Sequence, residues 1–313
     1  MVSPAMEDAT QSATAGARVK LLYDAVSAMM SALPLSVALA IGRGLGWFYG
    51  NILRYHRPQA LEALARAFPE ITLAERRTIL ARMYGYLGMN VAELLRMKRA
   101  SDEYYKTYVE WGELSHLHDT LKKGKGLLVL SAHTGNWDLL CSLAPHIGFP
   151  LTIITKDIKA RSVNEYWMDI RRRFGLQFVP AHNSYRLCLT ALKRNEVVGF
   201  VLDQNMIDVE GIFVDFFNKP ACTSPGLAYM SAQSGAPVVP VFAERLQGGR
   251  HRMHILPPID PPPNREPETI RQYTQLYTKV IEDFVREHPE QWIWIHRRWR
   301  TVLPPQTPTP GAG

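Results

Sequence analysis

The sequence is poor in cysteine, and that scarcity sets the first limits on what the protein is. It has three cysteines in 313 residues, Cys141, Cys188 and Cys222, which are far apart and form no C-x-x-C pair. An odd number of widely spaced cysteines argues against a disulfide framework and against a structural zinc site. The pattern fits a reducing, cytoplasmic setting.

The sequence also lacks the motifs of several large enzyme classes. It has no G-x-S-x-G nucleophile elbow, no G-x-x-x-x-G-K-[ST] phosphate loop and no H-E-x-x-H zinc motif. Its ten histidines include two close pairs, His116 with His118 and His251 with His254. Neither pair has a convincing carboxylate or cysteine beside it in the sequence, so we predict no metal site.

Neither end of the chain has the pattern of a folded element. Residues 1–16 are small and polar, without the basic start and apolar run of a cleavable signal, and residues 304–313 are rich in proline, glycine and threonine. We therefore expect a disordered leader and a disordered tail.

Residues 17–57 carry the most apolar part of the chain. Residues 25–42 contain no charged side chain, and as a straight helix they would extend about 27 Å, slightly less than the roughly 30 Å hydrocarbon core of a bilayer. Pro34 and three serines weaken the case for a full span. Aromatic and arginine side chains follow, a mixture typical of a headgroup boundary. We predict a membrane-associated helical segment: embedded in one leaflet or hairpinned, or a single transmembrane anchor. A buried core helix is the alternative.

Residues 58–303 have the pattern of one α/β domain. The stretch up to residue 100 indicates a pair of helices, with Thr72 as N-cap and Glu75 three positions later. From residue 124, short apolar runs alternate with helical stretches, which predicts a largely parallel central sheet flanked by helices. Ligands in such sheets bind beyond the carboxyl ends of the strands.

Two pairs of polar residues directly follow apolar runs, so we expect them beyond the carboxyl ends of strands. In "LVLSAHTGNWDLL" (128–140), His133 ends a strand and Asp138 lies in the first turn of the next helix. An aspartate that orients one ring nitrogen leaves the other free to accept a proton. Asp203 and Gln204 end the run "VVGFVLDQ", ahead of a helix whose N-terminus could hold an anion. The alternatives are chance polar residues in a core and an ordinary capped helix.

The net charge of +7 favours anionic partners, such as lipid surfaces, acidic proteins or nucleic acid. Near the C-terminus, "WIWIHRRWR" mixes tryptophans with basic residues, and we predict that Arg297, Arg298 and Trp299 meet a bilayer boundary or lipid phosphate. The alternative is that the tryptophans pack inward and the arginines are solvated. No nucleic-acid-binding pattern accompanies this segment, so we predict no nucleic-acid partner.

Four blocks of the sequence, in order, resemble a known family: "HTGNWD", "LDQN", "VDFFNKPACTSPGLAYMSAQSGAPVVPVF" and "PEQWIWIHRRWRT". They are similar to the late, or secondary, acyltransferases of bacterial lipid A biosynthesis, within the lysophospholipid acyltransferase superfamily, over about residues 20 to 302. The resemblance implies that a fatty acyl thioester, usually on acyl carrier protein, is transferred to a hydroxyl of a glycolipid at the cytoplasmic face of the inner membrane. It implies no cofactor.

Carried over to this sequence, the resemblance implies that His133 is the general base and Asp138 its acidic partner. Attack of the hydroxyl on the thioester is then direct, without an acyl-enzyme. Arg161, or Asn136 with backbone amides near Gly135, would stabilise the oxyanion, and Asp203 and Gln204 would shape the acceptor side.

Two departures from the family pattern are mild, and several alternatives stay open. Relatives commonly have Asn-Leu where this chain has residues 62–64, and glycine in place of Asn218. The donor could be coenzyme A rather than carrier protein, and the acceptor could be another glycolipid, such as a mannoside, or an aminolipid. A non-catalytic lipid-binding protein is the alternative from a different class.

Overall fold

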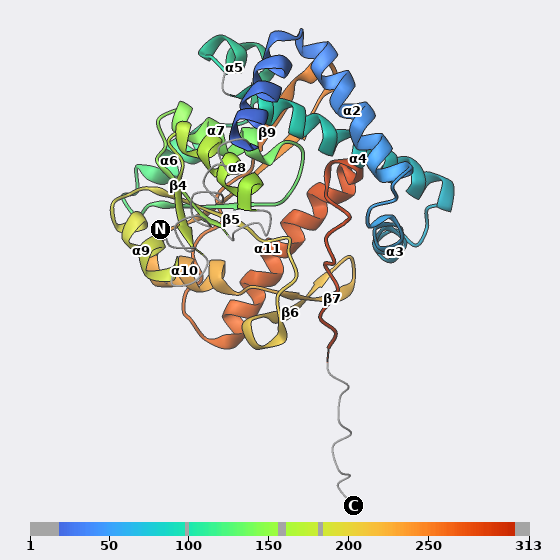
Figure 1. Ribbon diagram of the computed structural model, residues 1–313. Helices are drawn as coiled ribbons and strands as arrows, with labels where there is room; N and C mark the ends of the chain where they lie inside the picture. Colours follow the sequence, from blue (N-terminus) through green and yellow to red (C-terminus); the bar gives the residue numbers. More distant parts are fainter. Residues whose placement is uncertain (1–18, 98–99, 156–160, 181–183, 304–313) are drawn as a thin grey trace, which may run out of the picture.

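The computed structural model of the protein describes residues 19–97, 100–155, 161–180 and 184–303 (Figure 1). The predicted leader and tail, residues 1–16 and 304–313, lie outside the described residues.

A seven-stranded sheet forms the centre of the molecule, in the order β1-β9-β8-β2-β5-β3-β4. Every neighbouring pair is parallel except β8 with β9, which is antiparallel. The predicted α/β class with a largely parallel sheet is therefore confirmed. Its strands are β1 (Val109–Trp111), β2 (Leu127–Ser131), β3 (Leu151–Thr155), β4 (Gln177–Pro180), β5 (Val197–Val201), β8 (Val238–Arg245) and β9 (His251–Ile255).

A separate antiparallel hairpin of β6 (Ile212–Phe216) and β7 (Lys219–Thr223) lies outside the seven-stranded sheet. Its two-residue turn consists of Phe217 and Asn218, both with positive φ, 53° and 55°. Such turns match the right-handed twist of the flanking strands. Asn218 adopts the left-handed conformation readily, which explains why asparagine can replace glycine here.

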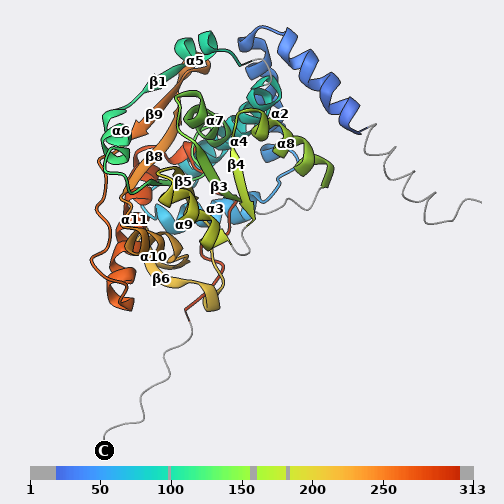
Figure 2. The same cartoon turned by 90° about the vertical axis from the view of Figure 1, so that its left-hand side faces the viewer.

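The helices cover both faces of the sheet. Successive side chains of β2 point to opposite faces, and because they are apolar, both faces must be covered. Leu128 and Leu130 pack into one apolar cluster with α3, α4, α9, α10 and α11, whereas Leu127 and Val129 face a second cluster formed with α6 and α7. Figure 2 shows this layered arrangement from the side. The bounds are α3 (Arg57–Ala67), α4 (Leu73–Arg96), α5 (Asp102–Tyr108), α6 (Ser115–Leu121), α7 (Trp137–His146), α8 (Arg161–Arg173), α9 (Ser184–Lys193), α10 (Gly226–Ser234) and α11 (Pro267–Glu287). The short 3-10 turns are η2 (Asp208–Glu210), η3 (Gln247–Gly249) and η4 (Pro289–Gln291).

The helix pair predicted after residue 58 consists of α3 and α4. At the start of α4, the Thr72 hydroxyl accepts a hydrogen bond from the Glu75 amide, and the Glu75 carboxylate accepts one from the Thr72 amide. This reciprocal arrangement is the capping box expected from the sequence.

The apolar N-terminal segment forms two helices rather than one. Residues 19–32 are helical, and a break at Pro34 separates them from α2 (Leu35–Asn51). Helix α2 lies along α4 (Figure 1). A Cβ atom at Gly42 would lie 2.6 Å from the carbonyl oxygen of Gly88, so the glycine is required for this close approach. No helix among the described residues combines the length and the apolar character needed to cross a bilayer.

Candidate active site

The two predicted polar groups meet at one edge of the sheet. Strands β2 and β5 are adjacent and parallel, with Ser131 paired to Val201, so both chains leave the sheet at the same edge. His133 follows β2 and Asp203 follows β5. Residues that are 70 positions apart in the sequence are thereby brought into contact.

His133 and Asp203 form a two-point contact. The Nδ1 atom of His133 lies 2.9 Å from Oδ1 of Asp203, and the backbone amide of His133 donates to Oδ2 at 2.9 Å. The indole Nε1 of Trp292 also donates to Oδ2, at 2.7 Å. These contacts fix the ring, and they favour the tautomer with the proton on Nδ1, which leaves Nε2 as a proton acceptor. Gln204 Nε2 is 3.5 Å from that atom.

The charges around His133 favour its protonated form. Burial by itself lowers the pKa of His133, but the charge and hydrogen bond of Asp203, with a further contribution from Asp138, raise it above its ordinary value. Burial likewise raises the pKa of Asp203, yet the nearby His133 holds it well below the usual range. The neighbouring ring of His296, 4.9 Å away between centroids, has its pKa lowered to about 4 by burial and by the charge of His133. His296 is therefore neutral at neutral pH.

The prediction that Asp138 orients His133 is wrong in its geometry. Asp138 is buried in the first turn of α7, and its Oδ1 accepts hydrogen bonds from Trp167 Nε1 at 2.9 Å and Arg171 Nε at 2.8 Å. The carboxylate is turned toward α8, whereas Asp203 reaches His133 from the neighbouring strand. Arg171, the first of three consecutive arginines at the end of α8, therefore lies in the site.

Gly135 and Asn136 serve the backbone rather than an oxyanion. The Gly135 amide donates to the carbonyl of Gln291 at 3.0 Å. Asn136 caps α7, since its Oδ1 accepts from the Leu139 amide at 3.0 Å, and its Nδ2 donates to Glu93 at 2.6 Å. Because the Gly135 amide and the Asn136 side chain are engaged in these contacts, the predicted oxyanion role of these two groups is corrected, and that of the neighbouring backbone amides stays a prediction.

A buried ionic network lies beneath this loop. The carboxylate of Glu93 contacts Arg245 Nη1 at 2.8 Å and His251 Nε2 at 3.0 Å, and Arg245 also donates to Asn90. Asn90 in turn donates to the carbonyl of Gly135 at 2.6 Å. Burial raises the pKa of Glu93, but its cationic neighbours hold it far below the usual range. The network fixes the loop between β2 and α7.

An apolar cavity of about 730 Å³ opens beside His133. It lies between the sheet and helices α7 and α8, and its volume is in the range of small-molecule sites. Gly199, in the middle of β5, leaves space that a side chain would fill. Polar groups at the cavity include those of Ser131, Arg171, Gln204 and His296; its apolar lining includes Leu117, Leu127, Val129, Leu140, Ile147, Phe149, Leu151, Ile153, Met253 and Ile255.

Three further predicted site residues have different outcomes. Gln204 is exposed at the mouth of the cavity. Arg161 begins α8, but its side chain lies outside the described residues. Arg297 is exposed, so its contact with lipid stays a prediction.

The expected lipid contact of Arg298 and Trp299 is corrected, because both side chains are buried. The guanidinium of Arg298 donates to the Cys222 carbonyl at 2.9 Å and to Thr223 Oγ1 at 2.5 Å. Trp299 packs on Phe216. This segment holds the β6–β7 hairpin and supplies Trp292 and His296 to the site.

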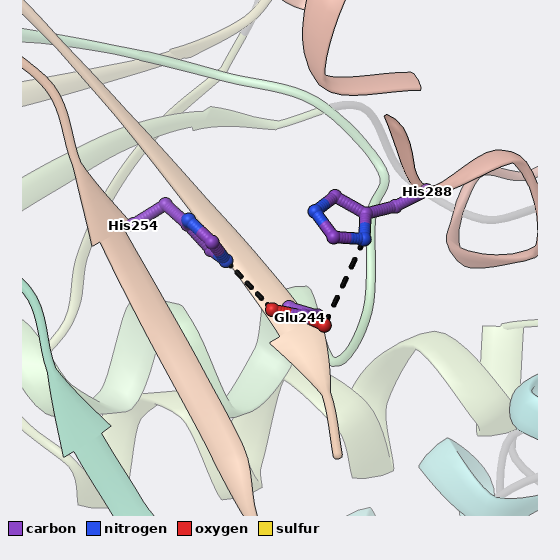
Figure 3. A group of neighbouring side chains, drawn as sticks. All are labelled: Glu244, His254 and His288. Carbon is purple, nitrogen blue, oxygen red and sulfur yellow. Dashed lines mark hydrogen bonds and ion pairs between the residues drawn. The ribbon is translucent and has the colours of Figure 1, made fainter. Parts of the chain in front are cut away.

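Away from the cavity, Glu244, His254 and His288 point toward one another from β8, β9 and the end of α11 (Figure 3). The carboxylate of Glu244 is 2.8 Å from His254 Nε2 and 3.7 Å from His288 Nδ1. The sequence reading missed Glu244 as the acidic partner of His254. These ligand types suit a divalent cation, but Arg252 lies 3.8 Å from Glu244 and disfavours added positive charge. The predicted absence of a metal stays a prediction.

Comparison with known proteins gives consistent matches. Residues 8–301 match the profile of the family described as bacterial lipid A biosynthesis acyltransferase. A lipid A biosynthesis acyltransferase of Haemophilus influenzae is 25% identical over 82% of this chain and 80% of its own length. A lipid A biosynthesis lauroyltransferase of Escherichia coli is 25% identical over 86% of this chain and 87% of its own. A phosphatidylinositol mannoside acyltransferase of Mycobacterium tuberculosis is 24% identical over 61% and 60%. Among solved structures, the 1-acyl-sn-glycerophosphate acyltransferase of Thermotoga maritima matches with a TM-score of 0.37 and 15% identity, over 81% of this chain and 97% of that one.

Proposed function

The chain belongs to the bacterial lipid A biosynthesis acyltransferase family, and on that premise we propose that it transfers a fatty acyl chain from an acyl thioester to a hydroxyl of a lipid A precursor. The observation that carries the proposal is the position of His133. Its Nε2, the proton acceptor in the favoured tautomer, stands at the mouth of an apolar cavity, while Nδ1 is held by a buried carboxylate. This arrangement provides a base beside a compartment suited to an acyl chain.

The reaction we propose has two steps and needs no covalent enzyme intermediate. His133 Nε2 removes the proton of the acceptor hydroxyl as its oxygen attacks the thioester carbonyl. The tetrahedral intermediate then collapses, the carbon–sulfur bond breaks, and the imidazolium returns its proton to the leaving thiolate. Asp203 stabilises the imidazolium between the two steps without taking the proton itself.

The state of Cys141 supports direct attack. This thiol lines the cavity, and burial raises its pKa to about 12. At neutral pH it is protonated, a thiol is a much weaker nucleophile than a thiolate, and no described base accepts a hydrogen bond from it. Cys141 is therefore unsuited to carry the acyl group.

We assign Asp138 a role other than the orientation of His133 that its spacing in the sequence suggested. It holds Arg171 at the cavity, where the guanidinium is close enough to lower the pKa of His133. A fixed cation in a site shielded from water stabilises negative charge that develops on the carbonyl oxygen. Arg161 stays a second candidate for that role.

We propose acyl carrier protein as the donor and the cytoplasmic face of the inner membrane as the location. The first rests on the family resemblance and on the excess of basic residues, which favours an acidic carrier. The second is supported by large apolar side chains that are exposed on the N-terminal helices, including Leu21, Leu22, Met29, Ile41, Leu45, Phe48 and Ile52. Exposed apolar surface of this kind marks contact with a partner or membrane.

Acyl transfer to another glycolipid is the second candidate. The specific observation in its favour is the 24% identity to a phosphatidylinositol mannoside acyltransferase. A mannoside acceptor would use the same base and the same cavity.

The test is acyl transfer by membranes that contain the wild type or His133→Ala, with acyl carrier protein thioesters, a tetra-acylated lipid A precursor or a phosphatidylinositol mannoside, and mass spectrometry of the product. We expect one added chain on the lipid A precursor with the wild type and none with the variant. His116→Ala, which changes a histidine outside the cavity, is the matched control. Transfer that survives in His133→Ala would overturn the assignment of the base, and transfer to the mannoside alone would favour the second candidate.

A further inference from the structure

A second concave region, apart from the acyl cavity, lies between α2, α4 and η3. It has a volume of about 800 Å³, and four arginines line it: Arg43, Arg57, Arg77 and Arg82. No aspartate or glutamate is among its lining residues. We name this region the arginine groove.

Three of these arginines have no partner within the part of the chain that the structure describes. Arg43, Arg77 and Arg82 are exposed, and none makes a hydrogen bond or an ion pair to a described residue. Arg57 is held by Asn51 Oδ1 at 2.5 Å and the Gly50 carbonyl at 3.3 Å. Like charges that share a concavity repel one another, so an anion that enters it gains from all four.

The helix that supplies Arg43 has three distinct faces. Gly42, Gly46 and Gly50 are buried, and they pack against α4. Arg43, Trp47 and Asn51, at intervals of four, line the arginine groove. A third stripe of exposed apolar side chains consists of Ile41, Leu45, Phe48 and Ile52, with exposed fractions of 41%, 65%, 47% and 54%.

Such an arrangement suits an interfacial helix. Its apolar stripe enters the acyl region of a leaflet. The face that lines the groove begins at Asn51, about 60° around the helix from Phe48, and it then lies on the headgroup side of that stripe. Guanidinium groups bind phosphate oxygens in a fork geometry, with short charge-assisted hydrogen bonds. Trp47, which lines the groove and is itself exposed, fits the same boundary.

We propose that the arginine groove binds the phosphate headgroup of an anionic membrane lipid. The site is separate from the acyl cavity, and it anchors α2 to the bilayer in a defined orientation. The inference extends the proposed membrane association and does not depend on acyl transfer.

The test is binding of the full-length protein to vesicles of phosphatidylglycerol and, separately, of phosphatidylcholine. The wild type is compared with Arg43→Gln/Arg77→Gln/Arg82→Gln. The matched control, Lys123→Gln/Lys125→Gln/Lys193→Gln, removes the same charge from exposed positions at the edge where the strands begin. All six side chains are exposed, so we expect folded variants, and thermal unfolding of each checks that.

We expect strong binding of the wild type to phosphatidylglycerol, and a loss of about 100-fold in the arginine variant, since each basic residue near an anionic surface contributes about tenfold or somewhat less. The lysine control should lose no more than about threefold, because charges beyond a Debye length from the bilayer are screened. Competition by millimolar inorganic phosphate against binding to phosphatidylglycerol vesicles, at constant ionic strength, distinguishes a free-phosphate site from a headgroup site.

Three results would overturn the proposal. Equal losses in the two triple variants would mean that only overall charge matters. Equal affinity of the wild type for both lipids would agree with membrane association but would contradict a site for an anionic headgroup. Full displacement by inorganic phosphate at concentrations that leave ionic strength unchanged would assign the groove to the free ion instead.

Discussion

Replacing Asp203 with asparagine should change the pH dependence of acyl transfer as well as its rate. His133 acts as a base only when neutral, so activity is expected to rise with pH through the pKa of His133. That pKa is raised by Asp203. Asp203→Asn removes the charge that is 2.9 Å from Nδ1, and the acidic limb of the profile should therefore move to lower pH.

The size of both effects follows from the geometry. An opposite charge in direct contact shifts a pKa by about 1–3 units, so the limb should move by about that amount. The plateau rate should fall by about 10²- to 10⁴-fold, because the imidazolium that forms during attack loses its counter-charge. Asparagine has nearly the same shape as aspartate and can still accept from Trp292 or the His133 amide, so the fold should persist.

The assay is kcat/KM for a labelled acyl thioester across pH, with Asp138→Asn as the control. Asp138 affects His133 less than Asp203 does, and its own contacts are to Trp167 and Arg171. Asp138→Asn should thus lower the rate while moving the limb little. If the acidic limb moves further in Asp138→Asn than in Asp203→Asn, the pairing of His133 with Asp203 is refuted. The sequence-based prediction that Asp138 is the partner of His133 would then be favoured again.

Four further outcomes follow from the site. Gly199→Leu should fill the middle of the cavity and shift the preference to shorter donors, with about a fourfold loss for each methylene that no longer fits; product masses from mixed-chain donors show this. Arg171→Gln should lower kcat by about 10²- to 10³-fold with little change in KM, and Arg171→Lys should recover part of it; steady-state kinetics distinguish the two parameters. Cys141→Ala should retain activity, and trapping of a labelled acyl group on the wild-type chain would contradict direct attack. Glu93→Gln should lower the free energy of unfolding by about 3–5 kcal/mol, because Arg245 and His251 lose a buried partner; urea unfolding measures this, and a change below 1 kcal/mol would show that the network is dispensable.

The sequence pattern was sufficient to place both polar groups at strand ends but not to pair them. Apolar runs fixed the positions of β2 and β5, and the rule for parallel sheets placed His133 and Asp203 at one edge. Which strands are neighbours depends on the crossovers, and two further strands, β3 and β4, intervene in the chain. Asp138 was nearer in sequence, so local spacing favoured the wrong carboxylate.

The C-terminal segment illustrates a different limit. Alternating tryptophans and arginines describe a bilayer boundary and a packed core equally well, because composition does not reveal what covers each side chain. Arg298 is buried with carbonyl and hydroxyl partners on the β7 strand, which belongs to a hairpin that the pattern of apolar runs does not predict. The indole of Trp292, which reaches Asp203, could be found only from the fold.

Each of the two aspartates near His133 has one favourable and one unfavourable effect on catalysis. Both raise the pKa of His133, which strengthens it as a base and also reduces the fraction that is neutral. Arg171 opposes them, since its charge lowers the same pKa while it pairs with Asp138. The ion pair between α7 and α8 therefore adjusts the basicity of His133, which Asp203 affects more strongly, and in the proposed mechanism it also supplies a cation for the oxyanion. Because Asn136 ties the start of α7 to buried Glu93, the position of that ion pair relative to His133 is fixed before substrate binds.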